Sequence, residues 1–233
     1  MAASAKLDDD PGGIEPADSP IPPGPFTGSD GRSCLLAAAV ALIGEHGYAA
    51  TDPAQIARAA GLLPWHFYRC FESEEACAIA AYDRALPWLE EQIAPLDDPE
   101  GDWPRAVVSI VERVLVLLAE HPDLARFCAW DFPRSGRAPL ARHQLTVDWL
   151  ASALRAGRRL CSWSAELPAL TEESLIGGAI WLLAHRAHYG EVADLGSLAP
   201  EIAYLLLVPY LDVDEARRVA APGGFPLSSA APS

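Results

Sequence analysis

The sequence predicts an all-α protein, with an N-terminal three-helix helix-turn-helix head and a larger helical body. Alternating runs of β-branched residues, which are typical of strands, are absent. Alanine- and leucine-rich segments of helical periodicity are instead separated by clusters of Pro, Gly and Asp. The chain has 233 residues, of which 51% are hydrophobic and 21% charged, and this is the composition of a globular protein that buries a core.

The chain divides into four regions by composition. Residues 1–27 are rich in Pro, Gly and Asp and poor in large apolar residues, so we expect a disordered acidic arm. The head occupies residues 28–75 and the body residues 76–212. Residues 213–233 end in AAPGGFPLSSAAPS and are expected to form a flexible tail.

Start and stop signals place the first helices of the head. A helix is expected from about residue 32 to 46, with Asp30 as its cap and Gly47 after its last turn. The next helix opens with DPAQ, which combines a capping Asp52, a proline at the first helical position and Gln55 three residues after the cap. It ends at residue 60, where Gly61 permits a left-handed turn.

A third short helix is expected from residue 64 to about 71, within GLLPWHFYRCF. Four consecutive rings cannot share one buried face, because neighbouring helical residues point about 100° apart. Phe67 and Phe71 are four residues apart, so we expect them to pack against the first helix. His66 and Tyr68 then lie on other faces of the helix.

The rest of the chain also shows helical periodicity. A longer helix is expected from Ser73, as a capping residue, to about residue 92, and DDPEGD ends it. The expected helices of the body span residues 103–120, 123–130, 138–158, 171–189 and 197–211.

Charge and cysteine content exclude several classes of protein. The net charge of −15, with Lys6 as the only lysine, argues against a general nucleic-acid-coating or membrane-surface role. The start of the chain lacks the apolar run of a signal peptide, and the greasiest stretches are too short to cross a bilayer. The cysteines lack metal-type CxxC spacing, so we expect reduced cysteines in a cytoplasmic protein: Cys34, Cys70, Cys77, Cys128 and Cys161.

Three motifs follow one another between residues 32 and 76: RSCLLAAAVALIGEHGY, TDPAQIARAAGL and HFYRCFESEEA. Together they resemble the TetR family of transcriptional regulators. The first is similar to the family's first helix, the second to its second helix, and the third to its recognition helix and the entry to the fourth. The resemblance implies a homodimer with two DNA heads, and a body that receives a small-molecule effector. It also implies a double-stranded DNA operator as partner, and most members of the family are repressors that a small molecule releases.

The resemblance also implies which residues contact DNA. Tyr68 and Thr51 are expected at phosphates, while Arg69 is able to form a fork of hydrogen bonds to guanine. The predicted set is Thr51, Gln55, Pro64, Trp65, His66, Tyr68 and Arg69. For Trp65, packing against a neighbouring helix is the alternative.

Three positions depart from the family's pattern. Leu63 replaces the usual Ser or Thr cap of the recognition helix, Trp65 replaces a small residue, and Glu74 replaces a phosphate-binding lysine. From residue 29 to 75, six acidic residues face three arginines, so the net charge is −3 where a polyanion would bind. A protein of the same fold that binds a ligand or partner but has lost its operator is therefore the alternative.

The body offers candidates for a largely apolar ligand site. The predicted residues share inward-facing stripes or interrupt apolar helices: Arg113, Phe127, Trp130, His143, Val147, Leu150, Trp181 and His185. The ordinary reading of any one of them is a core or half-exposed side chain.

The last helices are expected to form a four-helix dimer interface. Gly177 and Gly178 allow close approach of a second helix, and an apolar stripe follows in the next helix. That stripe consists of Ile202, Leu205, Leu206 and Pro209. Packing within one chain is the alternative.

The sequence gives little support to an enzyme. Serine nucleophile motifs and phosphate-binding loops are absent. His185 and His188 are spaced i, i+3 without a Glu-x-x-His or Cys partner, which argues against a metal site. We therefore expect no catalytic residues, no metal and no cofactor.

Overall fold

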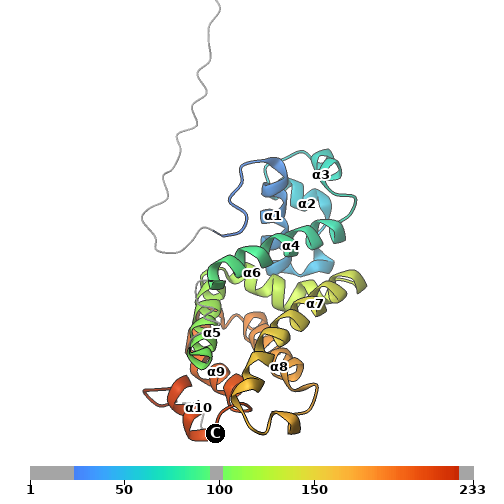
Figure 1. Cartoon of the computed structure of the whole chain (residues 1–233). Helices are drawn as coiled ribbons and strands as arrows, with labels where there is room; N and C mark the ends of the chain where they lie inside the picture. Colours follow the sequence, from blue (N-terminus) through green and yellow to red (C-terminus); the bar gives the residue numbers. More distant parts are fainter. Residues whose placement is uncertain (1–23, 95–101, 226–233) are drawn as a thin grey trace, which may run out of the picture.

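The computed structural model describes residues 24–94 and 102–225, which form helices joined by turns and contain no strand. Figure 1 shows the head at one end of the molecule and the helices α9 (Ala199–Leu207) and α10 (Val213–Ala220) at the other. Helix α4 (Glu74–Ile93) runs beneath the head and meets the body at α5 (Trp103–Glu120) and α7 (Arg137–Leu154). The predicted all-α class, with a small head and a larger body, is confirmed.

The three helices of the head form within a residue or two of the predicted bounds. They are α1 (Gly31–His46), α2 (Pro53–Ala59) and α3 (Pro64–Cys70). Asp30 caps α1 by accepting the N–H groups of Arg32 and Ser33, and Gly47 at φ 83° ends it. Both expected roles are confirmed.

Helix α4 (Glu74–Ile93) links the head to the body. The Ser73 hydroxyl accepts the N–H of Ala76, as the sequence predicts for a cap. One face of α4 buries Ala78, Ala81 and Tyr82 against α1, and the same face continues to the body.

The body consists of α5 (Trp103–Glu120), α6 (Pro122–Arg126), α7 (Arg137–Leu154), α8 (Thr171–His188), α9 (Ala199–Leu207) and α10 (Val213–Ala220). Short irregular helices join them: η3 (Phe127–Asp131), η4 (Phe132–Arg134), η5 (Arg155–Leu160), η6 (Ser164–Glu166) and η7 (Val192–Leu198). A further short turn, η1 (Tyr48–Ala50), follows α1. None of the helices in the described ranges is sufficiently long and apolar to cross a membrane.

The C-terminal segment corrects one expectation. The start of the expected flexible tail is the helix α10, which Asp212 caps by accepting the N–H of Glu215. Ala216 and Ala220 are buried, and α10 packs on α9 and α5. Half of the residues of α10 are charged, so its composition predicts a polar tail. The alanines nevertheless form a narrow apolar face that packs on the body. Residues 226–233 lie outside the described residues.

The head and the body share a hydrophobic core. Leu124, Phe127 and Phe132, which come from α6, η3 and η4, pack in the same cluster as Leu35 and Phe67 of the head. A second cluster lies among α5, α7, α8 and α9. The boundary predicted at residue 75 therefore marks a change of element and not a break in packing.

The end of the expected arm is ordered against the head. Phe26 packs on the head's core, and the carbonyl of Pro25 accepts the Arg84 Nε–H at 2.8 Å. The remainder of the predicted arm, residues 1–23, lies outside the described residues.

A buried ion pair fixes the far end of the body. The Glu172 carboxylate is fully buried and accepts hydrogen bonds from Arg158 Nε at 2.6 Å and from the Tyr210 hydroxyl at 2.9 Å. Arg158 also donates to the carbonyls of Ser164, Leu167 and Pro168. These contacts tie the segment between α7 and α8 to α8 and to the end of α9.

Candidate DNA-binding head and ligand cavity

Helices α2 and α3 form a helix-turn-helix. Asp52 and Gln55 complete a reciprocal capping box, with both N–H···O distances at 2.8 Å. Gly61, at φ 70°, makes the left-handed turn that a residue with a Cβ adopts only under strain. This local geometry sets α3 across the end of α2.

Two phenylalanines hold α3 to the head. Phe67 is fully buried and Phe71 almost so, and their ring centroids lie 5.7 Å apart. Both belong to the cluster that includes Leu35 and Ala39 of α1. Their predicted role in the core is confirmed.

The other face of α3 is exposed. Trp65 is 50% exposed and Tyr68 64%, and Pro64 and Arg69 are also exposed. The Arg69 guanidinium lies 5.4 Å from the centre of the Trp65 ring. A planar cation and aromatic side chains on one short helix make a surface suited to phosphates and base edges.

His66 lies between the exposed and the buried face. Its ring stacks on Trp65 with centroids 3.7 Å apart, and its Nδ1 is buried without a hydrogen-bond partner among the described residues. The contacts of Trp65 are thus with His66 and Arg69 of its own helix, and they do not bear out the alternative of packing against a neighbouring helix.

Two predicted DNA-contact residues are engaged within the head. Thr51 is only 7% exposed, and its hydroxyl donates to the Gly47 carbonyl at 3.0 Å. The Gln55 Oε1 atom accepts the Asp52 N–H in the capping box. The Thr51 side chain is therefore not available to DNA. The Gln55 side chain still has the two N–H donors of its amide group.

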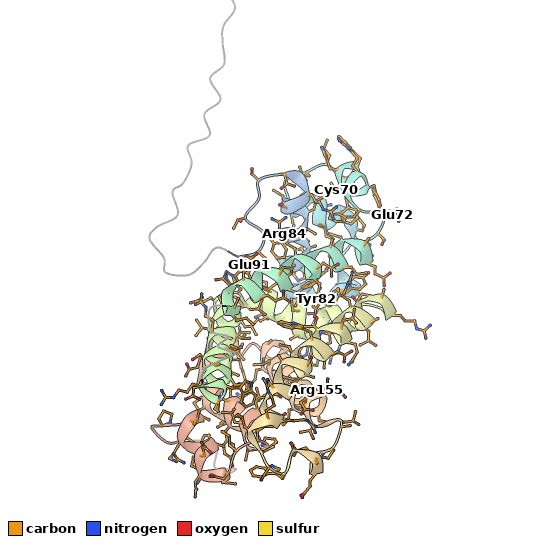
Figure 2. All side chains as sticks on the ribbon, viewed as in Figure 1. Cys70, Glu72, Tyr82, Arg84, Glu91 and Arg155 are labelled. Atoms are coloured by element: carbon orange, nitrogen blue, oxygen red, sulfur yellow. The ribbon has the colours of Figure 1, made fainter. Side chains whose placement is uncertain are left out.

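The positions that depart from the expected pattern have structural consequences. Leu63 caps α3 without a side-chain hydrogen bond, and Pro64 follows it at the first helical position. Arg32 donates to the Cys70 carbonyl at 3.0 Å and lies 4.3 Å above the Phe71 ring, so its charge serves the C-terminal end of α3. Figure 2 labels Cys70, the last residue of α3, and Glu72, which lies between α3 and α4. Glu74 is the first residue of α4.

A cavity of about 380 Å³ lies in the body. It is lined by α4, α5, α7, α8 and α9, and most of the lining side chains are aliphatic or aromatic: Val107, Ile110, Val111, Val114, Trp149, Leu150, Ile180 and Leu183 among others. Among the described lining residues, Glu90 is the only ionisable one. The cavity suits a small ligand that is apolar over most of its surface.

Residues 35–81 match the model for bacterial regulatory proteins of the tetR family. This match covers most of α1, the helix-turn-helix and the first part of α4. The head is a TetR-family domain.

Solved structures are similar over the TetR-family head and the body together. The fatty acid degradation regulator FadR from Bacillus halodurans has a TM-score of 0.66 and 21% identity, over 76% of this chain and 94% of its own. FadR from Bacillus subtilis, solved in complex with stearoyl-CoA, has a TM-score of 0.61 and 19% identity, over 75% and 96%. A TetR-like transcriptional regulator from Rhodococcus sp. RHA1 has a TM-score of 0.60 and 22% identity, over 77% and 94%.

These structures belong to transcriptional regulators and not to enzymes, and at such identities they establish the fold of the chain. Among curated proteins, no match was found.

The structure separates most of the predicted ligand residues from the cavity. Leu150 lines it, whereas Val147 is buried beside it in the body's core. Phe127 lies in the core that the body shares with the TetR-family head. The Arg113 Nη2 atom lies 3.5 Å from the side-chain amide Oε1 of Gln92.

The remaining predicted ligand residues also lie elsewhere. His143 Nδ1 lies 3.3 Å from the Tyr82 hydroxyl, and burial and the nearby Arg134 charge lower the pKa of His143. Trp130 stacks on His188, with ring centroids 4.1 Å apart. Trp181 is 59% exposed, and its ring centroid lies 5.2 Å from that of His185. These side chains do not line the apolar cavity, because periodicity shows that a face is apolar but not which neighbour it meets. Their part in ligand binding stays a prediction.

The apolar stripe of α5 lines the cavity, and it is the sequence feature that could have located the cavity. Val107, Ile110, Val111 and Val114 follow i, i+3, i+4, i+7 spacing, and all are only partly buried. An apolar stripe that a chain does not fully cover is typical of a cavity wall.

The predicted dimer surface is only partly exposed. Leu205 is 53% exposed, and a Cβ on Gly177 or Gly178 would meet nothing within 4 Å. Ile202 and Leu206 are buried in the body's core, so their side chains do not face a second copy. The carbonyl of Pro209, which is half-buried, accepts the Trp163 Nε1–H at 2.9 Å. The stripe thus divides between a buried and an exposed face of α9.

Proposed function

We propose that the protein is a homodimeric, ligand-responsive transcriptional regulator that binds a DNA operator. The observation that carries the proposal is the helix-turn-helix, in which α3 is anchored by Phe67 and Phe71 and exposes the opposite face. In this motif the second helix enters the major groove and the first crosses the backbone. A regulator of this kind acts on cytoplasmic DNA, and repression is the role that most members of the family perform.

The DNA contacts of the proposal come from the exposed face of α3. Arg69 forms hydrogen bonds to a guanine edge or a phosphate, and Tyr68 reaches a phosphate. Pro64, Trp65 and His66 lie on the N-terminal half of the helix, which leads into the groove. Gln55 contributes through its free amide N–H groups.

The effector of the proposal is a small, largely apolar molecule in the cavity of the body. The aliphatic lining and the volume of about 380 Å³ support it, and the structural likeness to a regulator solved with stearoyl-CoA makes an acyl chain a fitting class. Binding that favours one arrangement of the body shifts the spacing of two heads in a dimer.

The dimer of the proposal uses the exposed part of α8 and α9. Gly177, Gly178, Trp181 and Leu205 offer a surface with room for a second helix pair. Two helices from each chain would form a four-helix interface, which buries these side chains.

A second candidate is a ligand-binding protein of the same fold without operator binding. The charges favour it, because Glu72, Glu74 and Glu75 follow the recognition helix and Arg32 is engaged at the end of α3. Neutralised phosphates supply much of the affinity for DNA.

Selection of binding sequences from random duplex DNA separates the two candidates. Enrichment of a palindromic site, bound with a steep dependence on salt concentration, supports the regulator. Failure to enrich any sequence at low salt, with protein that is folded and binds its ligand, supports the second candidate.

A further inference from the structure

A second cavity, of about 400 Å³, lies where the head meets the body. None of its lining residues lines the apolar cavity. They come from the end of α1, from α6 and η3, and from the end of α8: Gly44, Glu45, His46, Gly47, Arg126, Trp130, Asp131 and His188. We refer to it as the junction cavity.

Two carboxylates face the junction cavity with few partners. Asp131 is half-buried, and within the described residues it accepts no hydrogen bond and forms no ion pair. Burial raises the pKa of Asp131, although the charges of His188, Arg134 and Arg126 oppose the rise. The Glu45 side chain is 67% exposed, and its Oε2 lies 3.8 Å from the Nε2 of His46. Asp131 is thus partly shielded from water and has no donor within the described residues, and an occupant of opposite charge would supply one.

Two helices direct their negative ends to the same place. Helix α1 ends at His46 and α8 ends at His188, and both residues line the junction cavity. The C-terminal end of a helix carries a partial negative charge and carbonyl groups without partners in the helix. No backbone N–H of the described residues outside the helices donates to the carbonyls of Glu45 and His46. The free carbonyls at the end of α1 favour a cation, whereas those of His185, Arg186 and Ala187 at the end of α8 accept backbone N–H groups of the following residues.

The guanidinium groups near the junction cavity already have partners. The Arg126 Nη1 atom lies 3.6 Å from the Asp123 Oδ1 atom, and the Arg126 Nε–H donates to the Ala187 carbonyl at 3.3 Å. Arg134 lies 3.7 Å from the centre of the Trp130 ring and donates to the Trp130 carbonyl at 2.6 Å. Both guanidinium groups are therefore engaged by other groups, and neither forms an ion pair with Asp131 within the described residues.

We propose that the junction cavity binds a small organic cation, such as a protonated primary amine or diamine, with its ammonium group between Asp131 and Glu45. The described residues hold no group of three or more His, Cys, Asp or Glu side chains arranged for a metal ion, which favours an organic cation over a metal. Because α1 belongs to the head and η3 and α8 to the body, the bound cation holds the two parts in one arrangement. The site is distinct from the effector cavity and goes beyond the proposed function.

Calorimetric titration of the full chain tests the proposal with four probes at equal ionic strength. Butane-1,4-diammonium and n-butylammonium chlorides are the cations, butan-1-ol is the neutral probe and sodium butyrate the anion. We expect the cations to bind and to raise the melting temperature, since a ligand that binds the folded state stabilises it. Asp131→Asn and Glu45→Gln each weaken the binding about tenfold or more. Glu112→Gln, at an exposed position of α5, is the matched control and leaves the affinity unchanged.

Three results would overturn the proposal. They are no heat of binding for either cation at ~10 mM, tighter binding of butyrate than of the cations, or an unchanged affinity in both carboxylate variants. Binding is measured without DNA and without an apolar effector, so its failure is distinct from a failure of the proposed function.

Discussion

The ring of Phe132 stacks on that of Tyr82, with centroids 4.0 Å apart and planes 8° from parallel. Tyr82 belongs to α4 and Phe132 to η4, so this pair joins the helix beneath the head to the body. Figure 2 shows Tyr82 at this junction. The Tyr82 hydroxyl also donates to Thr146 of α7 at 3.0 Å.

The pair predicts a large loss of stability in Phe132→Ala. Removal of a fully buried ring leaves a cavity, and we expect the free energy of unfolding to fall by about 3–5 kcal/mol, as measured by urea denaturation. Tyr82→Phe removes the hydroxyl and keeps the ring, and should cost about 1 kcal/mol. A smaller loss in Phe132→Ala than in Tyr82→Phe would contradict the importance of the stack.

The ion pair of Glu172 predicts a dependence of stability on pH. Burial would raise the pKa of Glu172, but hydrogen bonds from Arg158, a backbone N–H and Tyr210 outweigh it and hold the pKa below its usual value. The unfolded chain then binds a proton more readily, so the stabilisation is present above the unfolded pKa and is lost as pH falls through the folded one.

Glu172→Gln isolates this contribution. Near neutral pH we expect it to lower the free energy of unfolding by about 2 kcal/mol, and the difference from the wild type should shrink as urea titrations move from about pH 6 to about pH 3. Glu166→Gln, at an exposed position of the same segment, should match the wild type throughout. A constant difference across this pH range would show that Glu172 does not titrate as described.

The apolar cavity predicts that Ala179→Phe blocks the effector site. Ala179 lines the cavity from α8, so a ring there takes up part of the volume that a ligand would occupy. Stearate and stearoyl-CoA should bind the variant at least about tenfold more weakly than the wild type in calorimetric titrations. Ala165→Phe, at an exposed position of η6, is the control. Equal affinities in the two variants would place the ligand elsewhere.

The exposed glycines of α8 predict that Gly178→Glu gives a folded monomer. A Cβ at Gly178 meets nothing within 4 Å in one chain, so the change leaves the protomer intact but sets a charge in the proposed interface. Light scattering at micromolar concentration should give twice 24.9 kDa for the wild type and 24.9 kDa for the variant. Gly196→Glu, in η7 and also without contacts, should remain dimeric. A monomeric wild type would contradict the interface.

Local signals in the sequence predicted the head well. The capping box of Asp52 and Gln55, the turn at Gly61 and the buried pair Phe67 and Phe71 all depend on neighbours within a few residues. Such features are fixed by backbone geometry and helical spacing, which a single sequence displays.

The candidate ligand site was predicted poorly because it depends on contacts between distant helices. His143 occupies an inward-facing position of α7, yet it meets Tyr82 of α4 and not the cavity. Ile202 and Leu205 share a sequence stripe, but one is buried and the other exposed. Residues 127–131 form a π-helical turn in place of the regular helix expected to residue 130, and helical periodicity does not report such a change.

Fluorescence anisotropy with a duplex selected from random DNA tests the central claim most directly. We expect Tyr68→Ala and Arg69→Ala each to weaken binding by about tenfold or more, because their side chains form the exposed face of α3. Arg137→Ala, at an exposed position in the body, should bind as the wild type does. Unchanged affinity in both α3 variants would contradict the assignment of this face to DNA.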